Sequence, residues 1–245
     1  MDFTFGIITE GHNDNYILSI IDSIKQNNIP NYEIIIVGNT QINDSQIINI
    51  PFDESEKSGW ITRKKNIIAE VAKYENIVLL HDYIKLNDAW YTGFLQYGND
   101  FDWCVTQIKT IRGNRFRDYT LCPYLYLPPY NLQNLNTIDD YLNHHCLLPY
   151  NFINTLKTNK HLYISGSYYI IKKSVALLHQ LDETLCWGNG EDLEYAVRLH
   201  KNNIIIKCNP LSSVSILKEK IQIYWETQIN DEKLNKFINY CENHS

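Results

Sequence analysis

The alternation of short apolar runs with amphipathic stretches is the feature that most constrains how this chain can fold. Residues 3–9 (FTFGIIT) are mostly apolar and end in the turn-like EGHNDN. Residues 16–27 (YILSIIDSIKQN) place isoleucines at helical spacing, and residues 32–38 (YEIIIVG) form a nearly continuous apolar run. A continuous run predicts a strand buried on both faces, as in a parallel sheet. The order therefore predicts a β-α-β unit with a right-handed crossover.

The same alternation continues along the chain and predicts an α/β fold, with a mixed, mostly parallel sheet flanked by helices. The pattern weakens after residue 100, where a tyrosine- and proline-rich stretch (122–131) predicts a loop that covers either a ligand or the sheet edge. Further strands are expected at 46–52, 75–83, 101–110 and 203–210, a helix at 59–74, a strand, a glycine turn and a helix within 161–181, at most a short helix at 137–151, and a partly helical tail from 218.

The composition is that of a globular protein and excludes several classes. With 245 residues, 44% hydrophobic and 20% charged, the chain can bury the core of one domain. The net charge of -6 argues against a protein that binds a nucleic-acid backbone. The six cysteines are scattered without a CxxC pair or a secretion signal, so reduced thiols are expected rather than disulfides or a zinc site. No apolar run is long enough to span a bilayer, which predicts a cytoplasmic protein, free or at a membrane surface.

Polar side chains gather where the predicted strands end. In open α/β sheets, ligands bind beyond the carboxyl ends of the strands, so these residues are candidates for a binding site. A carboxylate such as Asp82 at such an end either holds a cation that bridges phosphate oxygens or simply caps the next turn. The strand-end residues are Thr9, Glu10, Gly38, Asn39, His81 and Asp82.

Three cations, Arg63, Lys64 and Lys65, stand near the start of the helix expected at 59–74. Cations there oppose the helix dipole, so stability alone does not favour them. An anion bound at that helix end would offset the cost, whereas a solvated basic face would need no ligand. Both interpretations remain open from the residues alone.

The stretch CWGNGEDLEYAVRL places three acids, Glu191, Asp192 and Glu194, directly after two glycines. Acids are favoured in the first turn of a helix, which would explain them structurally. A carboxylate on an adjustable loop could instead act as a general base, and Trp187 offers a flat face for a sugar ring. The histidines show no ligand spacing, and no GxSxG, GxGxxG or P-loop motif occurs, which argues against hydrolase, dinucleotide-binding and P-loop classes.

In this order, the stretches FTFGIITEGHNDNYILSIIDSI, YEIIIVGN, ITRKKNIIAEVAKYENIVLLHDY, YISGSYYIIKKSV and WGNGEDLEYAVRL resemble the GT-A glycosyltransferases. The resemblance is to family 2-like inverting enzymes, whose Gly-Glu-Asp signature is matched by the last stretch. It covers most of residues 3–209 and leaves the middle insertion and the tail uncovered. It implies one domain over 1–245, with a nucleotide-binding half (1–99), an acceptor and catalytic half (100–217) and a tail (218–245).

The resemblance also implies roles for individual residues. Asp192 would be the general base, Glu191 would bind the donor or acceptor sugar, and Asp82 would hold Mn²⁺ or Mg²⁺. The chain departs from the family pattern in three places: HDY stands where the family has Asp-x-Asp, Asn39 replaces an Asp, and a later metal-binding His is absent. The donor would contact Thr9, Glu10, Asn39, Arg63, Lys65, Asn66, His81 and Asp82, and the acceptor Gly166, Trp187 and Gly190.

The implied activity is the transfer of a sugar from a nucleotide-sugar, a UDP-sugar by preference, to an acceptor hydroxyl with inversion. The acceptor would be a glycan, a protein or a lipid-linked sugar, and association into a homo-oligomer is left open. One alternative is a catalytically silent nucleotide- or sugar-binding module, suggested by the altered HDY. Another is a sugar-phosphate nucleotidyltransferase, although the chain lacks the glycine-rich phosphate loop that such an enzyme needs.

Overall fold

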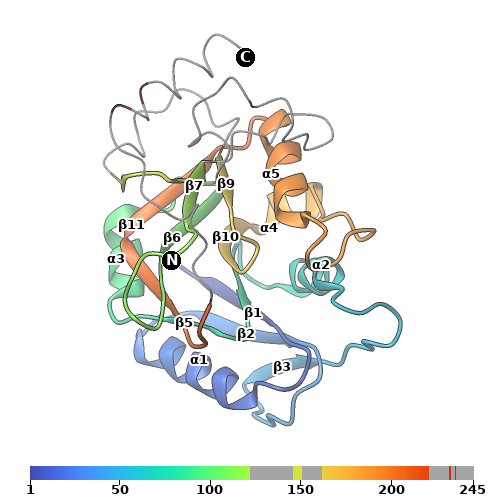
Figure 1. Ribbon diagram of the computed structural model, residues 1–245. Coiled ribbons are helices and arrows are strands. Elements are labelled where there is room, and N and C mark those ends of the chain that lie inside the picture. The colour runs from blue at the N-terminus through green and yellow to red at the C-terminus, as the bar shows by residue number, and fades with distance from the viewer. Residues whose placement is uncertain (122–145, 151–161, 221–231, 233–234, 236–245) are drawn as a thin grey trace.

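A central sheet of eight strands organises the computed structural model, which describes residues 1–121, 146–150, 162–220, 232 and 235 (Figure 1). Its strand order is β3-β2-β1-β4-β10-β6-β11-β5. Strands β1, β2, β3 and β4 run parallel to one another, as do β6 and β11, whereas β10 and β5 are antiparallel to their neighbours. The strands are β1 (Phe3–Ile8), β2 (Tyr32–Val37), β3 (Ile47–Ile50), β4 (Asn76–His81), β5 (Ile84–Leu86), β6 (Trp103–Lys109), β10 (Tyr168–Lys172) and β11 (Ile206–Ile216).

The register of the parallel strands brings their carboxyl ends to one level. Ile8 at the end of β1 is paired with Val37 of β2 and with His81 of β4. The loop after β2 turns at Gly38, whose φ of +138° lies in the region that favours glycine. A Cβ at this position would lie 2.1 Å from the carbonyl oxygen of Thr9. The sheet edge is therefore closely packed beneath the residues that follow each strand.

Five helices accompany the sheet in the part of the chain that the structure describes. Helix α2 packs on β1, β2 and α4, α3 packs on β11, and α1 packs beside β5. Phe3 of β1 makes edge contacts with Trp90 and Phe94 of α3, which joins that helix to the core. The helices are α1 (Asp14–Gln26), α2 (Ile61–Val71), α3 (Trp90–Tyr97), α4 (Lys173–Leu178) and α5 (Glu191–Lys201).

A second, antiparallel sheet in the order β8-β7-β9 contains β7 (Tyr119–Leu121), β8 (Cys146–Leu147) and β9 (Leu162–Ile164). Buried Asp118 supports its start, because it pairs with Arg115 at 2.6 Å and accepts the hydroxyl hydrogen bond of Tyr150. The predicted loop at 122–131, the tail beyond 220 apart from residues 232 and 235, and the segment at 137–151 apart from 146–150 lie outside the described residues. Residues 146–150 contain strand β8 instead of the short helix expected there.

The predicted fold class is confirmed: a mixed, mostly parallel sheet lies between helices. The expected strand at 203–210 is too short, since β11 continues through Pro210 to Ile216 with a register shift between Asn209 and Ser213. Strand β5 and helix α3 are present where the sequence analysis expected no element. Among the described residues, no helix is long and apolar enough to cross a membrane.

Candidate active site

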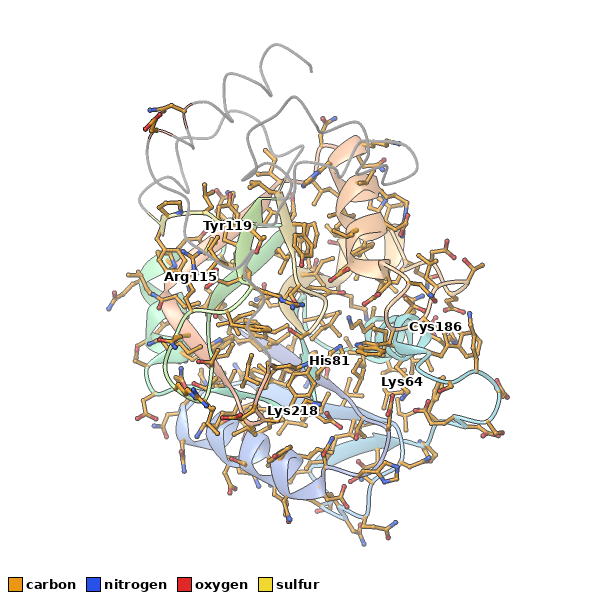
Figure 2. The ribbon with its side chains drawn as sticks, in the orientation of Figure 1. Lys64, His81, Arg115, Tyr119, Cys186 and Lys218 are labelled. Carbon is orange, nitrogen blue, oxygen red and sulfur yellow. The ribbon has the colours of Figure 1, made fainter. Side chains whose placement is uncertain are left out.

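A pocket of about 250 Å³ opens beyond the carboxyl ends of β1 and β4. Its floor comes from the strand ends, one wall from α2, and another from the residues that follow β11. Figure 2 shows three of its members, Lys64, His81 and Lys218, near the middle of the molecule. Its lining residues are Ile8, Thr9, Glu10, His12, Asn13, Ile61, Lys64, His81, Asp82, Tyr83, Trp187, Lys218 and Lys220.

Asp82 is held rigidly at the base of this pocket. Its Oδ2 accepts a hydrogen bond of 2.7 Å from the Thr9 hydroxyl and one of 2.9 Å from the Asn13 amide. Its backbone N–H donates to the carbonyl of Ile8 at 3.2 Å. One carboxylate oxygen is therefore used by neighbouring side chains, which positions the group and leaves Oδ1 as its less engaged atom.

His81 and Tyr83 flank Asp82 and pack edge to face, with ring centroids 5.4 Å apart. Burial lowers the pKa of His81 well below 6.5, and Lys65 and Lys220 add to the effect, so its ring is neutral at neutral pH. Its buried Nε2 has no hydrogen-bond partner among the described residues. A neutral imidazole has one donor and one acceptor nitrogen, so in the tautomer protonated at Nε2 this atom can donate to a ligand oxygen.

The acids of the Gly-Glu-Asp stretch begin α5, which starts after Gly190 in the left-handed region at a φ of +74°. Glu191 is buried and Asp192 is half-buried. The Asp192 Oδ2 accepts a 3.1 Å hydrogen bond from the Gly166 N–H. Glu194, the third acid, pairs instead with Arg198 one turn along the helix at 2.6 Å. The structure thus separates a structural acid from two that face the interior.

Lys65 of α2 connects these two acids to the turn between β9 and β10. Its ammonium group is buried and donates to the carbonyl of Gly166 at 2.6 Å. Burial lowers its pKa, and the charges of Glu191 and Asp192 oppose that change. Gly166 is therefore held from both sides, by the Lys65 ammonium at its carbonyl and by Asp192 at its N–H.

The pKa values of both acids are raised, chiefly because burial disfavours the charged form. For Glu191 the neighbouring Asp192 charge adds to the increase, and Lys65 opposes it. For Asp192 the Gly166 N–H and Lys65 oppose the increase. Paired acids with raised pKa values beside a buried cation are typical of sites that move protons.

The acid pair lies near the pocket but outside its lining. The N–H of His81, a lining residue, donates to the carbonyl of Ser167, the residue after Gly166, at 3.0 Å. Trp187, three residues before Gly190, lines the pocket although 68% of its surface is exposed. The N–H of Trp187 donates to the carbonyl of Gly59 just before α2 at 2.9 Å. Glu191 also contributes to the raised pKa of Tyr83, and Lys65 to the lowered pKa of His81. Trp187 and the backbone of His81 thus link the pocket to the elements that carry the acids.

The structure does not bring every candidate residue to the pocket. Arg63 pairs with Glu70 at 2.9 Å and with Glu183 at 3.1 Å on the outer side of α2. Asn66 donates to the carbonyl of Leu181 and to Glu183, both at 2.9 Å. Asn39 is exposed and lies close to Gly11 rather than in the lining. None of these three residues lines the pocket, so their predicted contacts with the donor are not supported.

Several lining residues were not among the candidates. Lys64 takes the position that the resemblance gave to its neighbours: its ammonium group donates to the Thr9 carbonyl at 2.8 Å and pairs with Glu54. Lys218 and Lys220 enter from the segment after β11, which the sequence analysis treated as the start of a polar tail. The pattern Lys-Glu-Lys directly after an apolar run was the available signal, because alternate residues of an extended chain share a face.

The described residues do not fit a divalent cation. They contain no group of three or more His, Cys, Asp and Glu side chains that could hold one. Asp82 offers one oxygen that is not already accepting, and Glu10 is exposed at the rim. Three ammonium groups line the same pocket, and they would repel a metal ion. The expected ligand set at Asp82 is therefore incomplete, and no chemical step is assigned to a metal.

Comparison with known proteins shows the fold. No protein-family model matches the chain, and no curated protein matches its sequence. Among solved structures, GalNAc-T7 with UDP, GalNAc and Mn²⁺ aligns with a TM-score of 0.63 and 13% identity over 98% of this chain and 47% of that one. TarS residues 1–349 from S. aureus, in complex with UDP-GlcNAc, align with a TM-score of 0.54 and 14% identity over 91% and 60%.

These neighbours are GT-A glycosyltransferases, and the chain has their fold, as the sequence resemblance predicted. The chain spans about half the length of GalNAc-T7, so the alignment concerns one part of that protein. At this level of identity the alignment establishes architecture, and the activity rests on the site geometry.

Proposed function

We propose that this protein is a glycosyltransferase that moves a sugar from a UDP-sugar to an acceptor hydroxyl with inversion at the anomeric carbon. The observation that carries the proposal is a lysine-lined pocket at the strand ends with a pair of acids near it at the start of α5, one buried and one half-buried. The pocket suits the nucleotide and diphosphate, and the acids suit the acceptor. Solved structures with this fold hold UDP and UDP-GlcNAc, which supports the choice of nucleotide.

Asp192 is the general base in this proposal. Its carboxylate takes the proton of the acceptor hydroxyl while that oxygen attacks the anomeric carbon, and the bond from this carbon to the diphosphate oxygen breaks. One base and no enzyme-bound intermediate give a single displacement, which inverts the configuration. Glu191 binds a hydroxyl of a sugar in the same region, and Trp187 provides an exposed ring against which a sugar can stack.

The direct test is the activity of Asp192→Asn with a panel of UDP-sugars. The measurement is the UDP released when the sugar is transferred to an acceptor or to water. Turnover should fall roughly 10²–10⁴-fold because the base is lost, while UDP affinity should stay within about twofold. Glu194→Gln is the matched control, since it changes an acid in the same helical turn that pairs with Arg198. Near-normal turnover in Asp192→Asn would overturn the assignment of the base.

The stereochemical part has its own measurement. NMR of the product of the wild-type enzyme should show an anomeric configuration opposite to that of the donor. Retention would contradict single displacement even if transfer occurs. Binding of UDP without transfer or hydrolysis of any donor would instead favour a silent binding module.

A further inference from the structure

Lys218 and Lys220 stack on the Tyr83 ring at the mouth of the pocket. Their ammonium groups lie 4.0 Å and 4.5 Å from the ring centroid. The backbone fixes this placement, because Ile216 pairs with Ile84 and the N–H of Leu217 donates to the Tyr83 carbonyl at 2.8 Å. The pairing of β11 with β5 therefore brings the segment that carries the two lysines to the pocket.

The charge of these two lysines is only partly compensated by the described part of the chain, in which Asp82 favours the charged form of Lys220. Lys64 pairs with Glu54, whereas neither Lys218 nor Lys220 forms an ion pair with a described residue. Partial burial lowers the pKa of Lys220 to about 8, and the charges of Lys218 and Arg117 add to this, opposed by Asp82. Like charges on one ring repel, so cation–π contact, worth about 0.5–1 kcal/mol at exposed sites, is a poor reason to place two lysines there.

An anion between the two lysines would remove this repulsion. The pocket also holds Lys64, whose ammonium group lies against the Thr9 carbonyl, and the unpartnered Nε2 of neutral His81. Charged hydrogen bonds from ammonium groups to phosphate oxygens are among the stronger polar contacts in proteins. The lysines thus supply positive charge in a pocket whose described residues do not form a set of metal ligands.

We propose that Lys218 and Lys220 bind the diphosphate of the nucleotide-sugar and compensate the charge of the leaving group without a divalent cation. The inference rests on the proposed function, because it assumes a donor in this pocket. When the bond between the anomeric carbon and the diphosphate oxygen breaks, its electron pair stays on that oxygen. The two ammonium groups offset the resulting negative charge, and the acceptor proton goes to Asp192.

The test is calorimetric titration of the full chain with UDP, GDP and uridine, first in EDTA and then with MnCl₂. UDP or GDP should bind in EDTA, and uridine should bind far more weakly. Lys218→Gln/Lys220→Gln should weaken nucleoside diphosphate binding by roughly 10–100-fold and leave uridine binding unchanged. Lys218→Arg/Lys220→Arg should keep most of the affinity, which separates loss of charge from loss of fold.

Lys85→Gln/Lys109→Gln is the charge-matched control. Both residues line a separate groove that shares no residue with the pocket, so the variant loses the same net charge elsewhere. Its diphosphate affinity should match the wild type. An equal loss in this control would mean that only overall charge matters, which would overturn the inference.

Two outcomes would overturn the lysine assignment and leave the proposed function standing: diphosphate binding that requires MnCl₂, or unchanged affinity in the Lys→Gln double variant. Absence of binding by either nucleoside diphosphate under both conditions, together with absence of transfer, would reject the proposed function itself. The two failures are therefore distinguishable.

Discussion

At the scale of single residues, the acid pair at the start of α5 is costly to the folded state. Both carboxyl groups have raised pKa values, so each binds its proton more tightly in the folded chain than in the unfolded chain. The stabilising contribution of the protonated form is present at low pH and is lost as pH rises through the folded pKa. At neutral pH the ionised acids therefore reduce the free energy of unfolding.

Asp192→Asn should consequently raise the melting temperature at neutral pH by roughly 1–4 °C, while it abolishes most turnover. The amide oxygen can still accept the hydrogen bond from the Gly166 N–H. The difference between variant and wild type should shrink as pH falls towards 3.8, the ordinary pKa of an aspartic acid. Thermal melts of both proteins across this pH range give the comparison. If the variant is less stable than the wild type at neutral pH, the ionised Asp192 carboxylate of the wild type is stabilising.

Gly166 tests how closely the acids approach the β9–β10 turn. A Cβ there would meet Glu191 Oε1 at 3.2 Å and Lys65 Nζ at 3.4 Å. Its φ does not require glycine, so Gly166→Ala probes crowding alone. The alanine should displace Glu191 and reduce kcat/KM by roughly 10-fold, with little change in UDP affinity. Unchanged kcat/KM would remove Glu191 from the reaction.

The sequence predicted which residues gather at the strand ends, but it did not predict which side of α2 each cation occupies. The strand-end residues Thr9, His81 and Asp82 could be placed together because parallel strands end at one edge. In the run Arg63-Lys64-Lys65, adjacent residues on a helix point about 100° apart. The resemblance selected Arg63 and Lys65, whereas the structure puts Lys64 in the pocket, Lys65 beside the acids and Arg63 outside.

At the scale of elements, α2 couples the pocket to the acid pair through Lys65. Its ammonium charge opposes the increase in the pKa of both Glu191 and Asp192. Lys65→Met should therefore raise the pKa of both acids further. Because the base must be ionised, the acidic limb of the pH profile of kcat/KM should move to higher pH. Lys65→Arg, which keeps the charge, should restore the profile in part.

Arg63→Gln on the same helix is the control for this shift. It loses the ion pairs with Glu70 and Glu183 and should lower the melting temperature by only a few degrees, because these groups are partly exposed. Its pH profile and UDP affinity should match the wild type. A pH profile unchanged in Lys65→Met would deny Lys65 a positioning role, and weak UDP binding in Arg63→Gln would return Arg63 to the donor site.

The elements that the sequence did not predict share a physical cause: tertiary packing overrides local preference. Helix α3 contains Gly93, which usually weakens a helix, yet a Cβ there would lie 2.4 Å from the Ser212 hydroxyl and 2.5 Å from the Leu211 carbonyl. Strand β11 continues past Pro210, which usually ends a strand, because the register shift absorbs the missing N–H. The close approach of α3 to β11 explains the glycine, and the register shift explains the proline.

At the scale of the whole molecule, the binding pocket is assembled from segments that are distant in sequence. The end of β1, the start of α2, the end of β4, the loop before α5 and the segment after β11 all contribute to its lining. Local patterns could identify the first four, since each ends a strand or begins a helix. For the last, the Lys-Glu-Lys pattern indicates a shared face but not its place in the fold, because that place follows from the pairing of β11 with β5, a strand of only three residues.

This assembly predicts a specific pattern of hydrogen exchange on UDP binding in EDTA. Protection should rise together in residues 8–13, 61–64, 81–83 and 217–220, since one ligand would contact all four segments. Residues 19–26, along the groove that contains Lys85 and Lys109, should remain unchanged and serve as the internal reference. Exchange measured by mass spectrometry with and without UDP resolves these segments. Protection confined to residues 8–13 would mean that UDP does not contact Lys218 and Lys220, because a diphosphate held by these lysines must also order the chain that carries them.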